Sequence, residues 1–171
     1  MQDHIHIKTS ADDHRIARLA ALAIGLHLIE AILPSPLPGV KPGIANIVTL
    51  FVLYRYDFST AAWVSLLRVF AGSLLLGHML SPTFVLSLSG ALASLGILWL
   101  AFKLPKAWFG PISLSILAAF AHTTAQLLVV WLWLIPHAGV AYLVPIFALA
   151  ALVFGVINGW ITTKLLSHSQ K

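Results

Sequence analysis

The sequence predicts an all-α integral membrane protein, a six-transmembrane-helix bundle with both termini on the cytoplasmic side. Three observations support this fold class. Apolar residues make up 60% of the 171 residues and charged residues only 9%, against roughly a quarter in an ordinary soluble domain. Six apolar segments approach the length needed to span a bilayer. Lysine and arginine are concentrated on one side of the alternating segments. We therefore expect lipid to surround most of the surface.

The six segments can be followed in order along the chain. They are Ile16 to Leu33, Gly39 to Tyr56, Thr60 to Leu80, Pro82 to Phe102, Ala107 to Ile135 and Gly139 to Leu166. Proline, glycine or charged residues separate them, most densely in the proline-rich stretch 33–39. The second segment opens with Gly39, Pro42 and Gly43, so we expect an irregular first turn. The fifth and sixth segments are long enough to tilt or to extend beyond the bilayer.

The positions of lysine and arginine orient this bundle. With an even number of spans and the N-terminus inside, most cations face the cytoplasm: Lys8, Arg15, Arg18, Arg55, Lys103, Lys106, Lys164 and Lys171. The outer loops hold only Lys41, and Arg68 falls within the third segment. This asymmetry is the positive-inside pattern. It divides the chain into a cytoplasmic polar leader (1–15), a membrane domain (16–166) and a cytoplasmic tail (167–171).

Small residues four positions apart recur in several segments. Such stripes let helix backbones approach each other closely in lipid, so packing inside the bundle is their ordinary explanation. The stripes are Ala17, Ala21 and Gly25 in the first segment, Ser73 and Gly77 in the third, Ser87 with Ala91 and Gly90 with Ser94 in the fourth, and Ala151, Gly155 and Gly159 in the last.

Arg68 is the most informative single residue, because it lies near the middle of the third segment. A charge at that depth costs at least about 2.5 kcal/mol, so the side chain should face protein or a water-filled cavity. Two explanations stay open. The guanidinium anchors a phosphate or carboxylate through bidentate hydrogen bonds, or it forms a structural ion pair or binds helix-end carbonyls.

Other polar residues lie near the predicted outer ends of the first two segments. Glu30 and Lys41 flank the proline-rich stretch. They either pair with each other or join Arg68 in an anion site, with Glu30 orienting one of the cations. Asn46 lies further into the second segment, where its amide binds either a ligand or a neighbouring backbone.

Histidine residues give a weaker signal. His27 and Glu30 are three apart and share a helix face, which is half of a carboxylate–histidine metal pair. The sequence has no second His-x-x-Glu pair and no cysteine, so we expect neither a metal ion nor another cofactor. His122 lies deep in the fifth segment beside Thr123 and Gln126. This polar patch either lines a cavity or meets a neighbouring helix.

Composition also excludes several functions. The net charge of +5 is spread singly over segment ends and forms no basic patch, so nucleic-acid binding is not expected. Only five acidic residues are present, and no aspartate-rich pair is available to hold magnesium against a diphosphate. There is no Gly-rich phosphate loop and no Ser/His/Asp set. We therefore expect no catalytic residues in this chain.

A resemblance to a known family rests on three stretches: Glu30 to Leu50, Leu67 to Gly77 and Ser87 to Ser94. They resemble the membrane family called heptaprenyl diphosphate synthase component I, also known as Gx transporter proteins. The most distinctive part is Pro38-Gly39-Val40-Lys41-x-Gly43-x-Ala45-Asn46. The resemblance covers most of the first four segments. It departs from the family at Pro42, where an apolar residue is more usual.

That family is in turn similar to the S-components of energy-coupling factor (ECF) vitamin transporters, which bind substrate. The resemblance implies an ECF S-component-like bundle in a bacterial cytoplasmic membrane, with a ligand pocket opening to the outer side. It implies a loop gate between the first two helices, which here would contain Pro34, Pro36, Pro38 and Gly39. It also implies that small residues of the first helix dock a transmembrane coupling subunit that works with ATPases. The matching residues are Ala17, Ala21 and Gly25.

Two main hypotheses follow. In the first, the chain is a binding and translocation subunit for a small, anionic, amphipathic molecule, either vitamin-like or isoprenoid-like. Its substrate-binding residues would be Glu30, Lys41, Asn46, Arg68, His122 and Gln126. In the second, the chain is a non-catalytic scaffold or accessory subunit for a prenyl synthase or another enzyme of isoprenoid or quinone synthesis. A membrane enzyme acting on a lipid-linked diphosphate is a third, which the lack of paired carboxylates disfavours.

Overall fold

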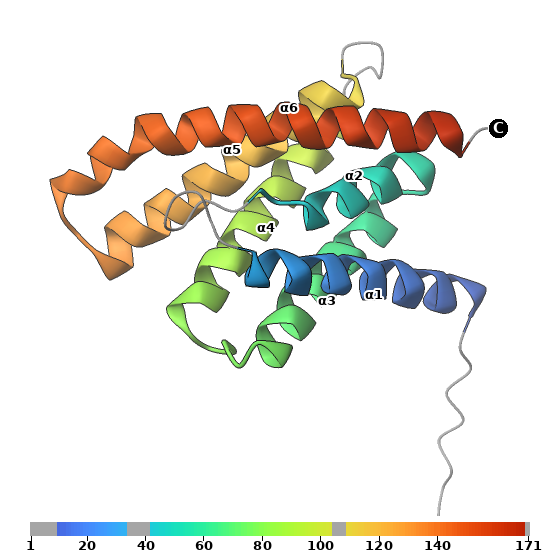
Figure 1. Ribbon diagram of the computed structural model, residues 1–171, viewed down its shortest axis with the longest axis horizontal. Helices are drawn as coiled ribbons and strands as arrows, with labels where there is room; N and C mark the ends of the chain where they lie inside the picture. Colours follow the sequence, from blue (N-terminus) through green and yellow to red (C-terminus); the bar gives the residue numbers. More distant parts are fainter. Residues whose placement is uncertain (1–9, 34–41, 104–108, 170–171) are drawn as a thin grey trace, which may run out of the picture.

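The protein folds as a bundle of α-helices (Figure 1). The computed structural model describes residues 10–33, 42–103 and 109–169, and these residues contain no β-strand. The helices are α1 (Ala11–Ile32), α2 (Ala45–Arg55), α3 (Phe58–Leu75), α4 (Pro82–Phe102), α5 (Pro111–Val129) and α6 (Val144–His168). A π-helix, η2 (Val130–Leu134), continues α5, and a 3-10 helix, η3 (Ala138–Leu143), leads into α6. The predicted all-α fold is confirmed.

Four helical stretches in the described part of the chain are long and apolar enough to cross a membrane. They are Phe58–Leu75, Pro82–Phe102, Pro111–Leu134 and Ala138–His168. The helix α2 is too short, with 11 residues, and α1 carries Arg15, Arg18 and Glu30 along its length. The chain is therefore a multi-pass membrane protein. Six spans and cytoplasmic termini stay predictions.

The first helix begins earlier than predicted, because Ser10 caps it. The Ser10 hydroxyl accepts a hydrogen bond from the Asp13 N–H (3.1 Å), and the Asp13 carboxylate accepts one from the Ser10 N–H (2.7 Å). This reciprocal pair is a capping box, which fixes the first helical turn. Residues 11–15 of the predicted polar leader are therefore helical.

Two further helix boundaries, the start of α2 and the end of α3, lie next to glycines with a left-handed backbone. The irregular start expected for the second segment is present: Gly43 has a φ of +70° and α2 begins only at Ala45. The third segment was predicted to reach Leu80, which is wrong, because α3 ends at Leu75 and Gly77 has a φ of +70°. A left-handed residue cannot continue an α-helix. The predicted bounds of α4 are confirmed.

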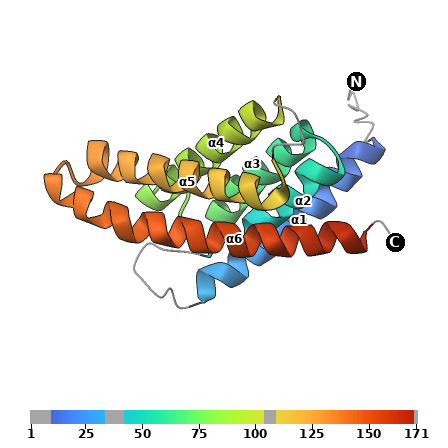
Figure 2. The same ribbon diagram turned by 90° about the horizontal axis from the view of Figure 1, so that it is seen from above.

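The short helix α2 lies at the centre of the bundle (Figures 1 and 2). It contacts α1, α3, α5 and α6, and seven of its residues are buried: Ala45, Ile47, Val48, Thr49, Leu50, Val52 and Leu53. Around it, α6 packs beside α5, α5 beside α4, and α1 beside α3. Because its neighbours shield α2, this helix does not need the length of a lipid-exposed span.

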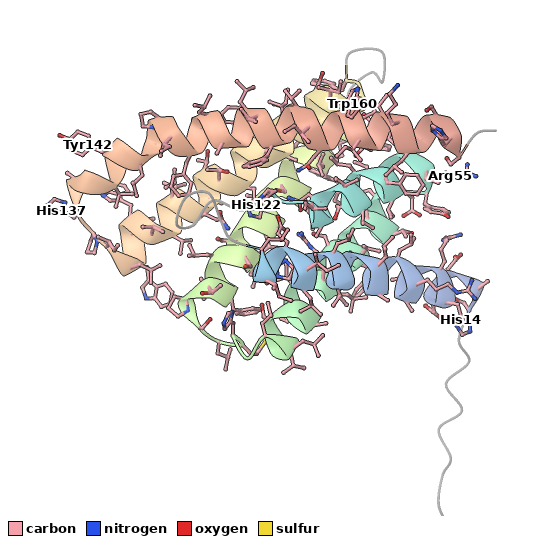
Figure 3. The ribbon with its side chains drawn as sticks, viewed as in Figure 1. His14, Arg55, His122, His137, Tyr142 and Trp160 are labelled. Carbon is pink, nitrogen blue, oxygen red and sulfur yellow. The ribbon has the colours of Figure 1, made fainter. Side chains whose placement is uncertain are left out.

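The bundle has two chemically different ends. The start of α1 and the end of α6 lie at the same end (Figures 1 and 2). Figure 3 places His14 and Arg55 at this end and His137 and Tyr142 at the opposite one. We call the end that holds the start of α1 and the end of α6 the basic end.

Cations stack on aromatic rings in three places toward the basic end. The pairs are Arg15 on Tyr56 (4.6 Å), Lys103 on Trp99 (3.5 Å) and Lys164 on Trp160 (5.8 Å to the ring centroid). Aromatic rings with a cation above them are typical of a membrane–water interface, where the ring stays in the apolar layer and the charge reaches water. This chemistry fits a membrane–water interface at that end.

The stripe on α6 brings two helix backbones together. A Cβ atom added to Gly159 would lie 2.5 Å from the Cα of Ile112, and one added to Gly155 would lie 2.9 Å from the Cα of Ile116. Both neighbours are backbone atoms of α5, which cannot rotate away as a side chain can. Glycine at these positions therefore allows α5 and α6 to pack closely.

We expect Gly159→Ala to destabilise the protein by about 1–3 kcal/mol, because the added methyl group overpacks the α5–α6 contact. The measurement is the Tm of the purified protein in detergent. Gly96→Ala is the matched control, since a Cβ at Gly96 has no neighbour within 4 Å and alanine favours helix. Equal Tm values for the two variants would contradict the close contact.

Asp57 caps α3 from outside the apolar segments. Its carboxylate accepts hydrogen bonds from the Thr60 N–H (2.8 Å) and the Thr60 hydroxyl (2.7 Å). These bonds favour the ionised carboxylate and hold the pKa of Asp57 below its ordinary value of 3.8. The charged form of the cap is therefore the stabilising one.

We expect Asp57→Ala to cost about 1 kcal/mol of stability near neutral pH, the usual value of an N-cap. A lowered pKa in the folded state means that the contribution of the charge is present above pH 3.8 and is lost as the pH falls through the folded-state pKa. The difference in Tm between the two proteins should therefore shrink as the pH falls below 3.8. A difference independent of pH would contradict this role of the carboxylate.

Candidate functional site

A cavity of about 280 Å³ lies between the helices, in the half of the bundle away from the basic end. All six α-helices contribute to its lining. The last turns of α1, the start of α2 and the first half of α6 form its walls together with α3, α4 and α5. Figure 3 shows one of its lining residues, His122, in the interior of the bundle.

The structure brings together most of the residues predicted to bind substrate. Five of the six line this one cavity: Glu30, Asn46, Arg68, His122 and Gln126. The sixth, Lys41, lies outside the described residues, as does its predicted pairing with Glu30. The predicted gate also lies outside them: Pro34, Pro36, Pro38 and Gly39.

Arg68 reaches the cavity from α3 and is only 5% exposed. Its Nε atom has no hydrogen-bond partner among the described residues. Arg68 forms no salt bridge with an acidic side chain of the described residues, although Glu30 lines the same cavity. Within those residues, Arg68 therefore has no structural ion pair.

Glu30 holds the start of α2. Its Oε1 atom accepts hydrogen bonds from the backbone N–H groups of Gly43 and Ile44, the latter at 3.2 Å. No side chain of α2 caps this helix, and a carboxylate at a helix N-terminus is favoured by the helix dipole. The prediction that Glu30 pairs with or orients a cation missed this role, in which Glu30 binds the backbone of the segment before α2.

Asn158 holds the same segment from α6. Its Nδ2 atom donates to the carbonyl oxygens of Pro42 (3.0 Å) and Gly43 (3.3 Å). A Cβ atom at Gly43 would lie 3.1 Å from the Asn46 amide nitrogen. The backbone at 42–44 is thus fixed between Glu30 and Asn158, where it forms a wall of the cavity. This agrees with the structural role expected of a lone amide in a membrane helix.

Two histidines lie against glycines at the cavity. A Cβ atom at Gly72 would lie 2.6 Å from the His27 ring, and one at Gly90 would lie 2.6 Å from the His122 ring. Glycine therefore makes room for each imidazole. The Nδ1 atom of His122 is buried and has no hydrogen-bond partner in the described part of the chain. Arg68 and His122 both line the cavity, and the lining around them is its polar wall.

The wall contributed by α6 is apolar. Phe147 and Phe154 are seven residues apart and therefore lie on one helix face, and Ala150 and Ala151 lie between them on the lining. Phe147 and Phe154 were not predicted to bind substrate. Their spacing was the available signal, but the apolar character of the whole segment obscured it. The cavity thus has a polar wall around Arg68 and an apolar wall on α6.

Comparison with known proteins identifies the family. The sequence model of heptaprenyl diphosphate synthase component I matches residues 19–165. The chain belongs to the heptaprenyl diphosphate synthase component I family. The match includes every residue that lines the cavity, and it confirms the resemblance seen in the sequence. No curated protein and no solved structure matches the chain.

In this family member, the small-residue stripe on the first helix is less closely packed against the rest of the chain than the stripe on α6. Ala17 and Ala21 are exposed, and a Cβ atom at Gly25 would have no neighbour within 4 Å. The stripe therefore contributes little to packing within the chain. Its small residues leave a surface that another helix can approach closely.

The cavity of this family member is lined by polar side chains that can bind a ligand. In the described ranges, no group of three or more His, Cys, Asp or Glu side chains is arranged to hold a metal ion. Glu30 is the one acidic residue among the described residues of the lining, and it already accepts two backbone hydrogen bonds. The arrangement offers a guanidinium whose Nε atom has no hydrogen-bond partner in the described part of the chain, together with an imidazole and amides, facing an apolar wall.

Proposed function

We propose that this component I family protein is a membrane-embedded binding and translocation subunit for a small, anionic, amphipathic molecule, comparable in role to an ECF S-component. The observation that carries the proposal is the buried Arg68 side chain, which lines the cavity and whose Nε atom has no hydrogen-bond partner among the described residues. A buried charge is costly unless it is paired and hydrogen-bonded. The anionic group of a ligand supplies that missing partner.

The polar wall would hold the anionic group. Arg68 offers a planar fork that suits carboxylate or phosphate, and the unpartnered His122 nitrogen lies on the same wall. Gln126 already donates to the carbonyl oxygen of Leu86 (3.3 Å), so its amide is held in place beside them. Lys41 is one residue from Pro42, which lines the cavity, and is our proposed second cation. The proposed gate, residues 34–39, lies between Glu30 and Pro42 in the sequence, and both of these residues line the cavity.

The apolar wall would hold the body of the ligand. Phe147 and Phe154 offer aromatic surface on α6. A cavity of roughly 150 Å³ binds benzene. The cavity of about 280 Å³ therefore suits a compact molecule about twice the size of benzene. A chain of seven isoprene units is much larger. We therefore propose a vitamin-like compound or a short isoprenoid as the substrate class.

Translocation requires an energising partner. The exposed stripe of Ala17, Ala21 and Gly25 is our proposed docking surface for an ECF-type transmembrane coupling subunit with its ATPases. The family name favours a second candidate function, in which the chain is a non-catalytic accessory subunit of heptaprenyl diphosphate synthase. In that case the same stripe, or the basic end, would contact the synthase. In neither case do we assign catalysis to this chain.

Native mass spectrometry of the protein, purified from its membrane in mild detergent, tests the proposal. We expect a retained small molecule that contains a carboxylate or phosphate and is smaller than heptaprenyl diphosphate. A ligand-free protein that co-purifies in fixed stoichiometry with a soluble prenyl synthase would instead support the accessory function.

A further inference from the structure

A second, smaller hollow lies at the centre of the bundle, next to the ligand cavity. Its volume is about 20 Å³, and Asn46, Ala119 and Asn158 line both spaces. Its other lining residues lie further along α2 and α4 and earlier on α3 and α5 than the cavity residues do. The hollow, which we call the central chamber, is therefore displaced from the cavity toward the basic end.

The lining of the central chamber is neutral and rich in hydrogen-bonding groups. Five helices supply them: Asn46 and Thr49 on α2, Ser65 on α3, Ser94 on α4, Ser115 on α5 and Asn158 on α6. No charged residue is among the lining residues. A site of hydroxyl and amide groups without a carboxylate or a cation suits a small neutral molecule better than an ion.

Thr49 shows that these groups are not all satisfied by the protein. The side chain is 5% exposed, and its hydroxyl has no hydrogen-bond partner among the described residues. By contrast, the Ser94 hydroxyl donates to the Ala118 carbonyl (2.9 Å). A buried hydroxyl without a partner is unfavourable, and buried polar groups left over by the protein are commonly satisfied by ordered water.

We propose that the central chamber is a binding site for one ordered water molecule, which hydrogen-bonds the Thr49 hydroxyl and bridges it to polar groups of the surrounding helices. The volume is sufficient, because a water needs roughly 10–15 Å³ by this kind of measure. The required two to four polar partners are present on the lining. The site shares Asn46 and Asn158 with the proposed ligand cavity, whereas Arg68 and His122 do not line the chamber.

The substitution Thr49→Val tests the water site, because valine keeps the side-chain shape and removes only the hydroxyl. If water is bound, the variant lacks the hydroxyl that hydrogen-bonds it, and its Tm should fall below that of the unmodified protein. In a dry chamber, the variant removes an unsatisfied hydroxyl, and its Tm should rise. Thr162→Val is the matched control, because the buried Thr162 hydroxyl donates within its own helix to Asn158 (2.8 Å).

Radiolytic hydroxyl-radical labelling gives a second measurement that needs no variant. Bound water generates radicals where it lies, so we expect rapid labelling of Leu95 and Leu98, two buried residues on the chamber lining. A rise in Tm for Thr49→Val would overturn the proposal. Absence of labelling at both leucines in the unmodified protein would overturn it as well.

Discussion

Arg68→Ala should abolish ligand retention without destabilising the empty protein. Hydrogen bonds to charged groups contribute about 1.5–3 kcal/mol each, so loss of a bidentate contact weakens binding by roughly 100-fold or more. Arg68→Lys keeps the charge but not the planar fork, and we expect intermediate binding. Since Arg68 has no bonded partner among the described residues, its removal should leave the Tm of ligand-free protein unchanged or raised.

The readouts for Arg68 are the fraction of protein carrying a co-purified ligand in native mass spectrometry and the Tm after that ligand is removed. Arg55→Ala is the control, because Arg55 is exposed and lies at the basic end, away from the cavity (Figure 3). Unchanged ligand retention in Arg68→Ala would contradict the anchor. A loss of several kcal/mol in ligand-free protein would show that Arg68 is structural.

Glu30→Ala is expected to have the largest effect on stability, about 3–5 kcal/mol. The substitution leaves the partly buried N–H groups of Gly43 and Ile44 without their acceptor, and each such loss costs about 1–3 kcal/mol. Glu30→Gln keeps an oxygen that accepts hydrogen bonds, so its cost should be smaller.

The measurement for Glu30 is unfolding in detergent together with hydrogen exchange at the start of α2. We expect faster exchange of the Gly43 and Ile44 amides in Glu30→Ala. Asp12→Ala serves as the control, because Asp12 is an exposed acid whose salt bridge to Arg15 (2.8 Å) should contribute less than about 1 kcal/mol. Equal destabilisation by the two substitutions would contradict the role of Glu30 as a cap.

The residues around the cavity were predictable where a single physical rule applies to each of them. Arg68 and His122 lie in apolar segments, where lipid excludes a polar side chain, so each had to face protein or a cavity. The bounds of α4 followed from Ser81-Pro82 at its start, because the Ser81 side chain caps the helix and proline suits its first turn.

Roles that depend on contacts between distant residues could not be predicted. Glu30 binds backbone 13 and 14 residues away, and Asn158 binds the same segment from α6. Nothing in the local sequence encodes these partners. The central position of α2 also depends on its neighbours, because an apolar helix of 11 residues has no periodicity that distinguishes lipid from protein.

The most direct test of the ligand-binding claim is a high-resolution map of the protein purified from its native membrane. We predict compact density in the cavity, within about 3 Å of the Arg68 guanidinium and in contact with Phe147 and Phe154. An Arg68 side chain bonded to main-chain carbonyl oxygens, in a cavity closed by apolar side chains, would contradict the account.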